Sequence, residues 1–212
     1  MSVLRLICSP RGAASESYRL SQFVVRALAR TDAERGRELV DFDVNQLSHV
    51  DAEYAWALGS PADPAQATGT LCESDGLIRA LAAADYLVIA TPMHNYTVPS
   101  ALKAWVDHVL RVRHSFNVTR QGKVGLLADR PVFLAAASGG FFTGERARQP
   151  DFLTPYLKAA MATMGLKSFH AFAVEGTAMG RAALQAARLR AQAQIAGFFA
   201  PVPGEQEAVL PA

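Results

Sequence analysis

An apolar run that changes abruptly into small hydroxyl residues constrains the fold of this chain more than any other feature. Residues 3–8, Val-Leu-Arg-Leu-Ile-Cys, have the length and the β-branched, apolar character of a buried parallel strand, which Pro10 and Gly12 end. From Leu20 onward, apolar residues recur every three or four positions, as they do on the buried face of a helix. The order strand, loop, helix therefore predicts that the hydroxyl-rich loop ends at a helix N-terminus.

The loop at residues 9–17 has the groups of an anion site. The first turn of a helix presents unpaired backbone N–H groups and the positive end of the helix dipole, which together attract a phosphate. Side-chain donors add to them. The donors that this loop offers are Ser9, Arg11, Ser15 and Ser17. Taken alone, the loop fits an ordinary helix cap with solvated serines equally well.

Several functional classes are not favoured. No strand is followed by a Gly-x-Gly-x-x-Gly fingerprint or a P-loop, which disfavours Rossmann-type dinucleotide binding and P-loop hydrolysis. A formal net charge of +2 with scattered arginines gives no sign of nucleic-acid binding or of a polybasic membrane surface. The two cysteines, Cys8 and Cys72, and the lack of a long apolar span predict a cytoplasmic protein with no structural metal site. Cys8 is expected to be a small core residue rather than a nucleophile.

Strands and helices are expected to alternate along the whole chain. The further strands are expected at residues 38–43, 86–90, 132–137 and 168–174, a hairpin at 115–127, and helices at 74–84, 99–113, 152–164 and 181–199. At 212 residues and 50% hydrophobic content, the chain suits one α/β domain. We expect this domain over residues 1–200 and a loose tail over 201–212. The predicted fold is a three-layer α/β/α sandwich with a five-stranded parallel sheet.

Two more loops are expected at the same sheet edge as residues 9–17, because ligands of such sheets bind beyond the carboxyl ends of the strands. The loop after residues 86–90 suits a flat aromatic ligand, since it offers apolar, polarizable surface and free backbone groups. It contains Met93, His94, Asn95 and Tyr96. The loop after residues 132–137 has paired glycines, which let the backbone approach a ligand closely but also occur in plain tight turns. It contains Ser138, Gly139 and Gly140.

Together these loops resemble the FMN-dependent NADH:quinone oxidoreductase and azoreductase family, whose fold is flavodoxin-like. The resemblance covers about residues 3–199, and residues 92–107 are its most specific part. It implies that the FMN phosphate is held by Ser9, Arg11, Ser15, Glu16 and Ser17, with Glu16 acting through its backbone. It also implies that Met93, His94, Asn95 and Tyr96 line the isoalloxazine ring, and that Ser138, Gly139 and Gly140 flank its pyrimidine side.

The resemblance also implies the reaction. Family members pass two electrons by a ping-pong mechanism from NADH or NADPH through FMN to quinones and azo compounds, so no catalytic side chain and no metal are expected. A homodimer is implied, in which Phe116 and its neighbours contact the partner, with no nucleic-acid or membrane partner. Phe116 and Val118 are expected to lie outside the monomer's core. Two departures stand out. The family usually has tyrosine where His94 stands, and a Ser-Arg-Gly-Gly turn where this chain has Ala137-Ser138-Gly139-Gly140.

Two alternatives remain open from the sequence. An NADPH-dependent FMN reductase would differ mainly in its nucleotide and its acceptor. A non-catalytic FMN electron carrier would be strongly acidic and would use a threonine-rich phosphate loop. The net charge of +2 and the Ser9-Pro10-Arg11 loop argue against the carrier.

Overall fold

The computed structural model describes residues 1–31, 38–64 and 66–200, so the predicted tail at 201–212 lies outside the described residues. Its centre is a five-stranded sheet with the strand order β2-β1-β3-β6-β7. The strands are β1 Ser2–Ile7, β2 Glu38–Asp43, β3 Tyr86–Pro92, β6 Val132–Ala137 and β7 Phe169–Val174. All neighbouring strands in this sheet are parallel. The predicted parallel sheet is confirmed.

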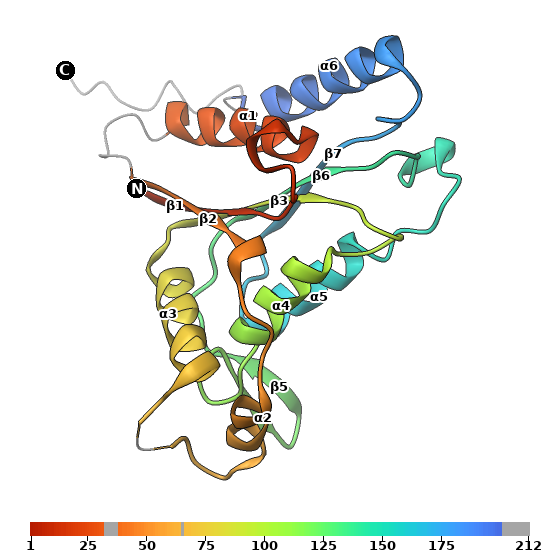
Figure 1. Cartoon of the computed structure of the whole chain (residues 1–212). Helices are drawn as coiled ribbons and strands as arrows, with labels where there is room; N and C mark the ends of the chain where they lie inside the picture. The colour runs from red at the N-terminus through yellow and green to blue at the C-terminus, as the bar shows by residue number, and fades with distance from the viewer. Residues whose placement is uncertain (32–37, 65, 201–212) are drawn as a thin grey trace, which may run out of the picture.

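Helices cover both faces of the sheet (Figure 1). One face carries α1 Glu16–Thr31 and α6 Arg181–Phe198, and the other carries α3 Gly69–Ala83, α4 Ser100–Val109 and α5 Thr154–Met164. Side chains alternate between the faces along each strand. In β3, Val88 packs in the core under α1 and α6, whereas Leu87 and Ile89 pack on the opposite side with Trp105 of α4. This is the predicted α/β/α sandwich.

A smaller group of elements lies away from the carboxyl ends of the parallel strands. It contains α2 Ala52–Gly59 and a two-stranded antiparallel hairpin, β4 Phe116–Thr119 and β5 Gly122–Gly125. The hairpin was predicted, but the expectation that Phe116 lies outside the monomer's core is wrong. Phe116 is only 7% exposed, whereas Val118, two residues further along the same face of β4, is 67% exposed. Burial in β4 is therefore confined to its first residue. Single 3-10 turns are found at Gly12–Ala14, Val44–Gln46 and Gly144–Arg146.

Some helix boundaries differ from the predicted ones. The helix expected to run to residue 113 ends at Val109, because the buried guanidinium of Arg111 donates to Asp75 of α3 at 2.7 Å and the backbone then turns at Arg113 with φ of 70°. Ser100 does not cap α4; Pro99 precedes its first turn without a side-chain cap. Among the residues that the structure describes, no helix has both the length and the hydropathy needed to span a membrane.

Candidate functional site

The loop between β1 and α1 is folded around its serines. Gly12 has φ of 51°, a left-handed conformation that glycine adopts without strain, and it reverses the chain toward α1. The Ser15 hydroxyl donates to the carbonyl oxygen of Gly12 at 2.8 Å and accepts from the amide of Tyr18 at 3.2 Å, so it caps α1. The side chains of Ser9 and Ser17 are also buried. The loop is therefore a compact structure rather than a loosely solvated connection.

This loop keeps backbone donors available for an anion. The amides of Glu16 and Ser17, at the start of α1, have no hydrogen-bond acceptor within the described part of the chain. The Arg11 side chain is exposed, and its amide donates to the Ser9 hydroxyl at 3.2 Å. Free amides beside buried hydroxyls at a helix N-terminus form a site that fits a phosphate group. The loop thus combines a Ser15 cap with free amides, and the anion site stays a prediction.

The loop after β3 makes a tight, strained turn. Asn95 and Tyr96 have φ of 48° and 72°, and the turn is closed by two 3.0 Å hydrogen bonds between the backbones of His94 and Thr97. Left-handed backbone costs a non-glycine residue about 1 kcal/mol or more. The amide of Phe152, which donates to the Tyr96 carbonyl oxygen at 3.0 Å, helps to hold the turn. The turn leaves the side chains of His94, Asn95 and Tyr96 exposed, while Met93 is buried beneath it.

The loop after β6 lies against the loop after β3. The amide of Met93 donates to the carbonyl oxygen of Ala137 at 2.8 Å. The side-chain amide of Gln149 donates to the Ser138 hydroxyl and to the Met93 sulfur, both at 3.1 Å. Sequence reasoning missed Gln149, because no motif surrounds it and only the folded loop brings it to Ser138. The Ser138 side chain is buried, whereas Gly139 is exposed.

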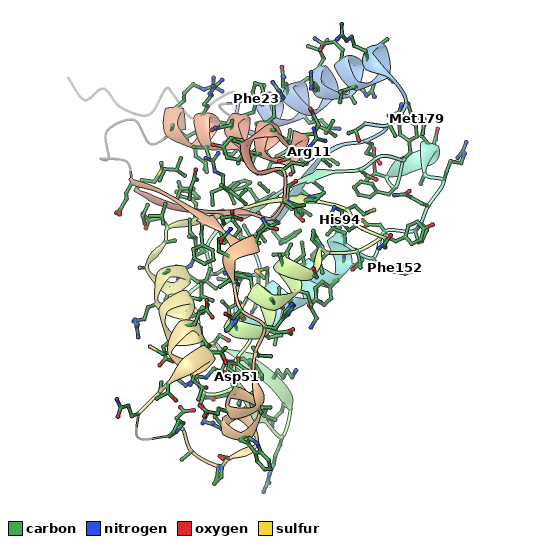
Figure 2. The ribbon with its side chains drawn as sticks, in the orientation of Figure 1. Arg11, Phe23, Asp51, His94, Phe152 and Met179 are labelled. Carbon is green, nitrogen blue, oxygen red and sulfur yellow. The ribbon has the colours of Figure 1, made fainter. Side chains whose placement is uncertain are left out.

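All of the predicted site residues lie at the carboxyl ends of β1, β3 and β6, which are adjacent in the sheet. Figure 2 shows Arg11 and His94 near this same end, on loops from two different strands. The candidate anion site at residues 9–17 therefore lies at one side of a surface. The exposed turn at His94 and the glycine pair Gly139-Gly140 also contribute to this surface. This arrangement can bind a ligand that has both a terminal phosphate and a flat ring system.

The side chain of Glu16 contacts α6 rather than solvent. The Arg188 guanidinium donates to both of its carboxylate oxygens, at 2.6 and 2.8 Å, in a two-point ion pair. The hydrogen bond to Arg188 is the main reason why the pKa of Glu16 is lower than its ordinary value. Sequence reasoning placed only the backbone of Glu16 at the site and missed Arg188.

Two other features lie apart from this surface. Cys8 is fully buried, and burial raises the pKa of its thiol, which keeps it protonated and inert as a nucleophile. A cavity of about 680 Å³ lies beside the edge strand β7 and α6, and the described residues that line it include none of the predicted site residues.

Comparison with known proteins gives a family match over nearly the whole chain. Residues 1–197 match a family described by its flavodoxin-like fold. The chain is 45% identical over 188 residues to "FMN-dependent NADH:quinone oxidoreductase 4" of Pseudomonas fluorescens, covering 87% of this chain and 89% of that protein. It is 42% identical over 193 residues to "FMN-dependent NADH:quinone oxidoreductase 5" of Burkholderia lata, covering 88% and 91%.

Solved structures with the same fold include azoreductases. The crystal structure of azoreductase AzrA has a TM-score of 0.80 and 19% identity, covering 94% of this chain and 99% of that one. An FMN-dependent NADH-azoreductase from Bacillus anthracis in complex with FMN has a TM-score of 0.72 and 20% identity, covering 94% and 99%. At these identities, the likeness to solved structures shows the shared fold.

Proposed function

Because the chain belongs to the flavodoxin-like family of FMN-dependent NADH:quinone oxidoreductases, we propose that it is an enzyme that binds FMN and passes two electrons from NADH to quinones. Azo compounds are proposed as poorer acceptors. The observation that carries the proposal is the pair of free amides at Glu16 and Ser17, which lie at the same sheet edge as the exposed His94 turn.

The phosphate end of FMN is assigned to the β1–α1 loop. The free amides of Glu16 and Ser17 are hydrogen-bond donors that can bind a phosphate without the help of a lysine side chain. The hydroxyls of Ser9, Ser15 and Ser17 lie in the same loop. The exposed Arg11 guanidinium can approach the same anion from solvent. The loop has no second glycine-rich turn for a pyrophosphate, which favours FMN over FAD.

The ring end of FMN is assigned to the loops after β3 and β6. Tyr96 offers exposed aromatic surface above the buried Met93, and the tight turn at Asn95 can present backbone groups to the edge of a heterocycle. Gly139 and Gly140 let the opposite loop approach closely. Gln149 fixes the separation of the two loops through Ser138 and Met93.

When bound, FMN supplies a flavin that accepts hydride from a nicotinamide and delivers it to the acceptor. The protein's residues bind and orient the reactants, and no nucleophile or metal is required of them. The side chains of His94, Asn95 and Tyr96 are exposed, which suits planar acceptors that approach from solvent without strong selection among them. We therefore propose one site that donor and acceptor occupy in turn.

Steady-state kinetics tests this proposal. The FMN-loaded protein is assayed over a grid of NADH and benzoquinone concentrations, with NADPH as a second donor. Parallel double-reciprocal lines are expected for alternation at one site, whereas intersecting lines would reject it. A flavin that NADH reduces but that gives quinones no electrons would point instead to a flavin reductase or an electron carrier.

A homodimer is part of the proposal. Support comes from the β4–β5 hairpin and the residue that follows it: Val118 and Val124 in the hairpin and Leu126 after it are 67%, 50% and 45% exposed. A second copy packing on this hairpin and on α4 would cover these apolar side chains. Light scattering should give a dimer mass that persists on dilution, and a monomer that retains full activity would contradict the dimer. The cytoplasmic location stays a prediction, which cell fractionation would check.

A further inference from the structure

An acidic side chain lies at the very place where the proposed function requires an anion to bind. Glu16 is the first residue of α1, and its own amide is one of the two free donors. A carboxylate at this position competes with a phosphate in two ways. Its charge repels the phosphate, and its oxygens can accept hydrogen bonds from the same first-turn amides.

In the folded chain Glu16 is held away from these amides. Both of its carboxylate oxygens accept hydrogen bonds from Arg188 of α6: Nη2 donates to Oε1 at 2.6 Å, and Nε donates to Oε2 at 2.8 Å. The Glu16 and Arg188 side chains are only 17% and 25% exposed, so salt and water screen this pair less than a surface pair. The carboxylate is therefore both neutralised by a cation and turned toward the α6 side of the loop.

Another arginine lies near Glu16 but does not hold it. Nε of Arg19 is 3.8 Å from a Glu16 oxygen, and the Arg19 side chain is 55% exposed. A single long contact at an exposed position contributes little and leaves the carboxylate free to move. The charges of Arg11 and Arg19 also favour the ionised form of Glu16, but of these three arginines only Arg188 holds the carboxylate in one direction by two hydrogen bonds.

We propose that Arg188 is a positioning residue for the FMN phosphate: by holding and neutralising Glu16 it keeps the first turn of α1 open to a dianion. This inference rests on the proposed function. It assigns a cofactor-related task to α6, an element that contributes none of the predicted contacts to the cofactor. Arg188 acts on the phosphate through Glu16 and not by contact.

Titration of the apoprotein with FMN and with riboflavin tests the inference, because riboflavin has the ring but no phosphate. Flavin fluorescence gives the Kd. In Arg188→Gln the freed carboxylate should weaken FMN about 10-fold, or about 1.4 kcal/mol, while the riboflavin Kd changes less than about twofold. Arg19→Gln is the matched control: it removes the same charge from a nearby exposed position, and its FMN Kd should change less than about twofold.

The second substitution separates this role from simple docking of α6. Glu16→Gln alone breaks the ion pair but also removes the repelling charge, so FMN affinity should be equal to or higher than that of the unmodified protein. Glu16→Gln combined with Arg188→Gln should restore FMN binding to within about threefold. The FMN Kd of the Glu16→Gln protein tests the proposed role of the ion pair even if Arg188→Gln folds poorly, because this measurement does not require the Arg188 variant.

Two results would overturn the inference. One is an Arg188→Gln protein that loses FMN and riboflavin equally; the other is a Glu16→Gln protein that loses FMN about 10-fold. Either would mean that the pair only holds α6 in place. An unmodified protein that binds FMN no better than riboflavin would instead contradict the phosphate site of the proposed function, so the two failures are distinguishable.

Discussion

The side-chain amide of Gln149 donates to the Ser138 hydroxyl at 3.1 Å. This hydrogen bond joins the start of the loop after β6 to a residue 11 positions later in the chain. The same amide donates to the sulfur of Met93, which brings the loop after β3 into one network. A Cβ added to Gly140 would lie 2.6 Å from the other end of this amide, at Oε1. The observed position of the Gln149 side chain therefore requires a glycine at position 140.

The first prediction follows from this network. Gln149→Ala removes the link between the two ring-side loops, so FMN and riboflavin should both weaken, by about fivefold for one lost hydrogen-bonded side chain. Gly140→Ala should weaken both flavins similarly, because its methyl displaces the flexible end of Gln149. Combining the two substitutions should cost no more than either one alone. Fully additive losses in fluorescence titrations would mean that the methyl at 140 meets the flavin itself.

The serines of the β1–α1 loop should distinguish the phosphate from the ring. Ser9→Ala and Ser17→Ala should each weaken FMN about 10-fold or more, since hydrogen bonds to a charged group contribute about 1.5–3 kcal/mol. Riboflavin should be nearly unaffected. The exposed Ser100, on α4, provides the control, and Ser100→Ala should leave both Kd values unchanged. Equal weakening of FMN and riboflavin would place the phosphate elsewhere.

His94 should influence the acceptor more than the cofactor. Its side chain is exposed at the strained turn, and an imidazole has less stacking area than the tyrosine that usually stands there in the family. His94→Tyr should change the ratio of kcat/KM between a benzoquinone and a larger naphthoquinone by about threefold or more, while the FMN Kd stays within about twofold. His49→Tyr, at an exposed position before α2, serves as the control. A large loss of FMN affinity in His94→Tyr would make His94 a cofactor contact.

The Glu16–Arg188 pair should also appear in acid stability. Arg188 lowers the pKa of Glu16 in the folded state below the ordinary value of 4.5, so the unfolded state takes up more protons as the pH falls. The stabilisation is complete above pH 4.5 and is lost as the pH falls through the folded pKa. Urea unfolding should show the unmodified protein more stable than Glu16→Gln by under about 1 kcal/mol near neutral pH, with the difference shrinking in acid. A difference independent of pH would contradict an ionic origin.

Gly165 should be a glycine whose substitution costs much stability. It ends α5 with φ of 106°, and a Cβ there would lie 2.4 Å from the carbonyl oxygen of Leu127. Gly165→Ala should destabilise the protein by about 3 kcal/mol, because left-handed strain adds to a clash with backbone. Gly76→Ala, in open space within α3, should instead stabilise by up to about 1 kcal/mol. Thermal unfolding of the two variants in parallel checks both signs.

The sheet was predictable because each strand has a local signature. Residues 86–90 are uninterrupted apolar residues, and the structure buries nearly all of them in β3. The periodic apolar residues from Leu20 onward, after a strand and a hydroxyl-rich loop, predicted a helix N-terminus at the end of that loop, and Ser15 caps α1 there. The other two site loops were predicted at the carboxyl ends of two further strands, and the sheet order brings all three loops to one edge. The family resemblance then assigned a role to each loop.

What the sequence did not predict depends on contacts between distant residues. Arg188 reaches Glu16 across 172 positions, and Gln149 reaches Met93 across 56. Neither contact leaves a periodic or spaced signal in a single sequence. Phe116 is similar, since it is the one buried residue of the short strand β4, and only tertiary packing at the start of the hairpin decides that.

The reach of the Glu16–Arg188 pair has a consequence for how the protein is made. Translation proceeds from the N-terminus, so the loop of residues 9–17 leaves the ribosome long before residue 188 is synthesised. During that interval the carboxylate of Glu16 is without Arg188, and under the role proposed for Arg188 the nascent loop should bind a phosphate poorly. High-affinity cofactor uptake should therefore begin only when α6 has emerged and docked, which makes cofactor loading one of the last events in the maturation of this chain.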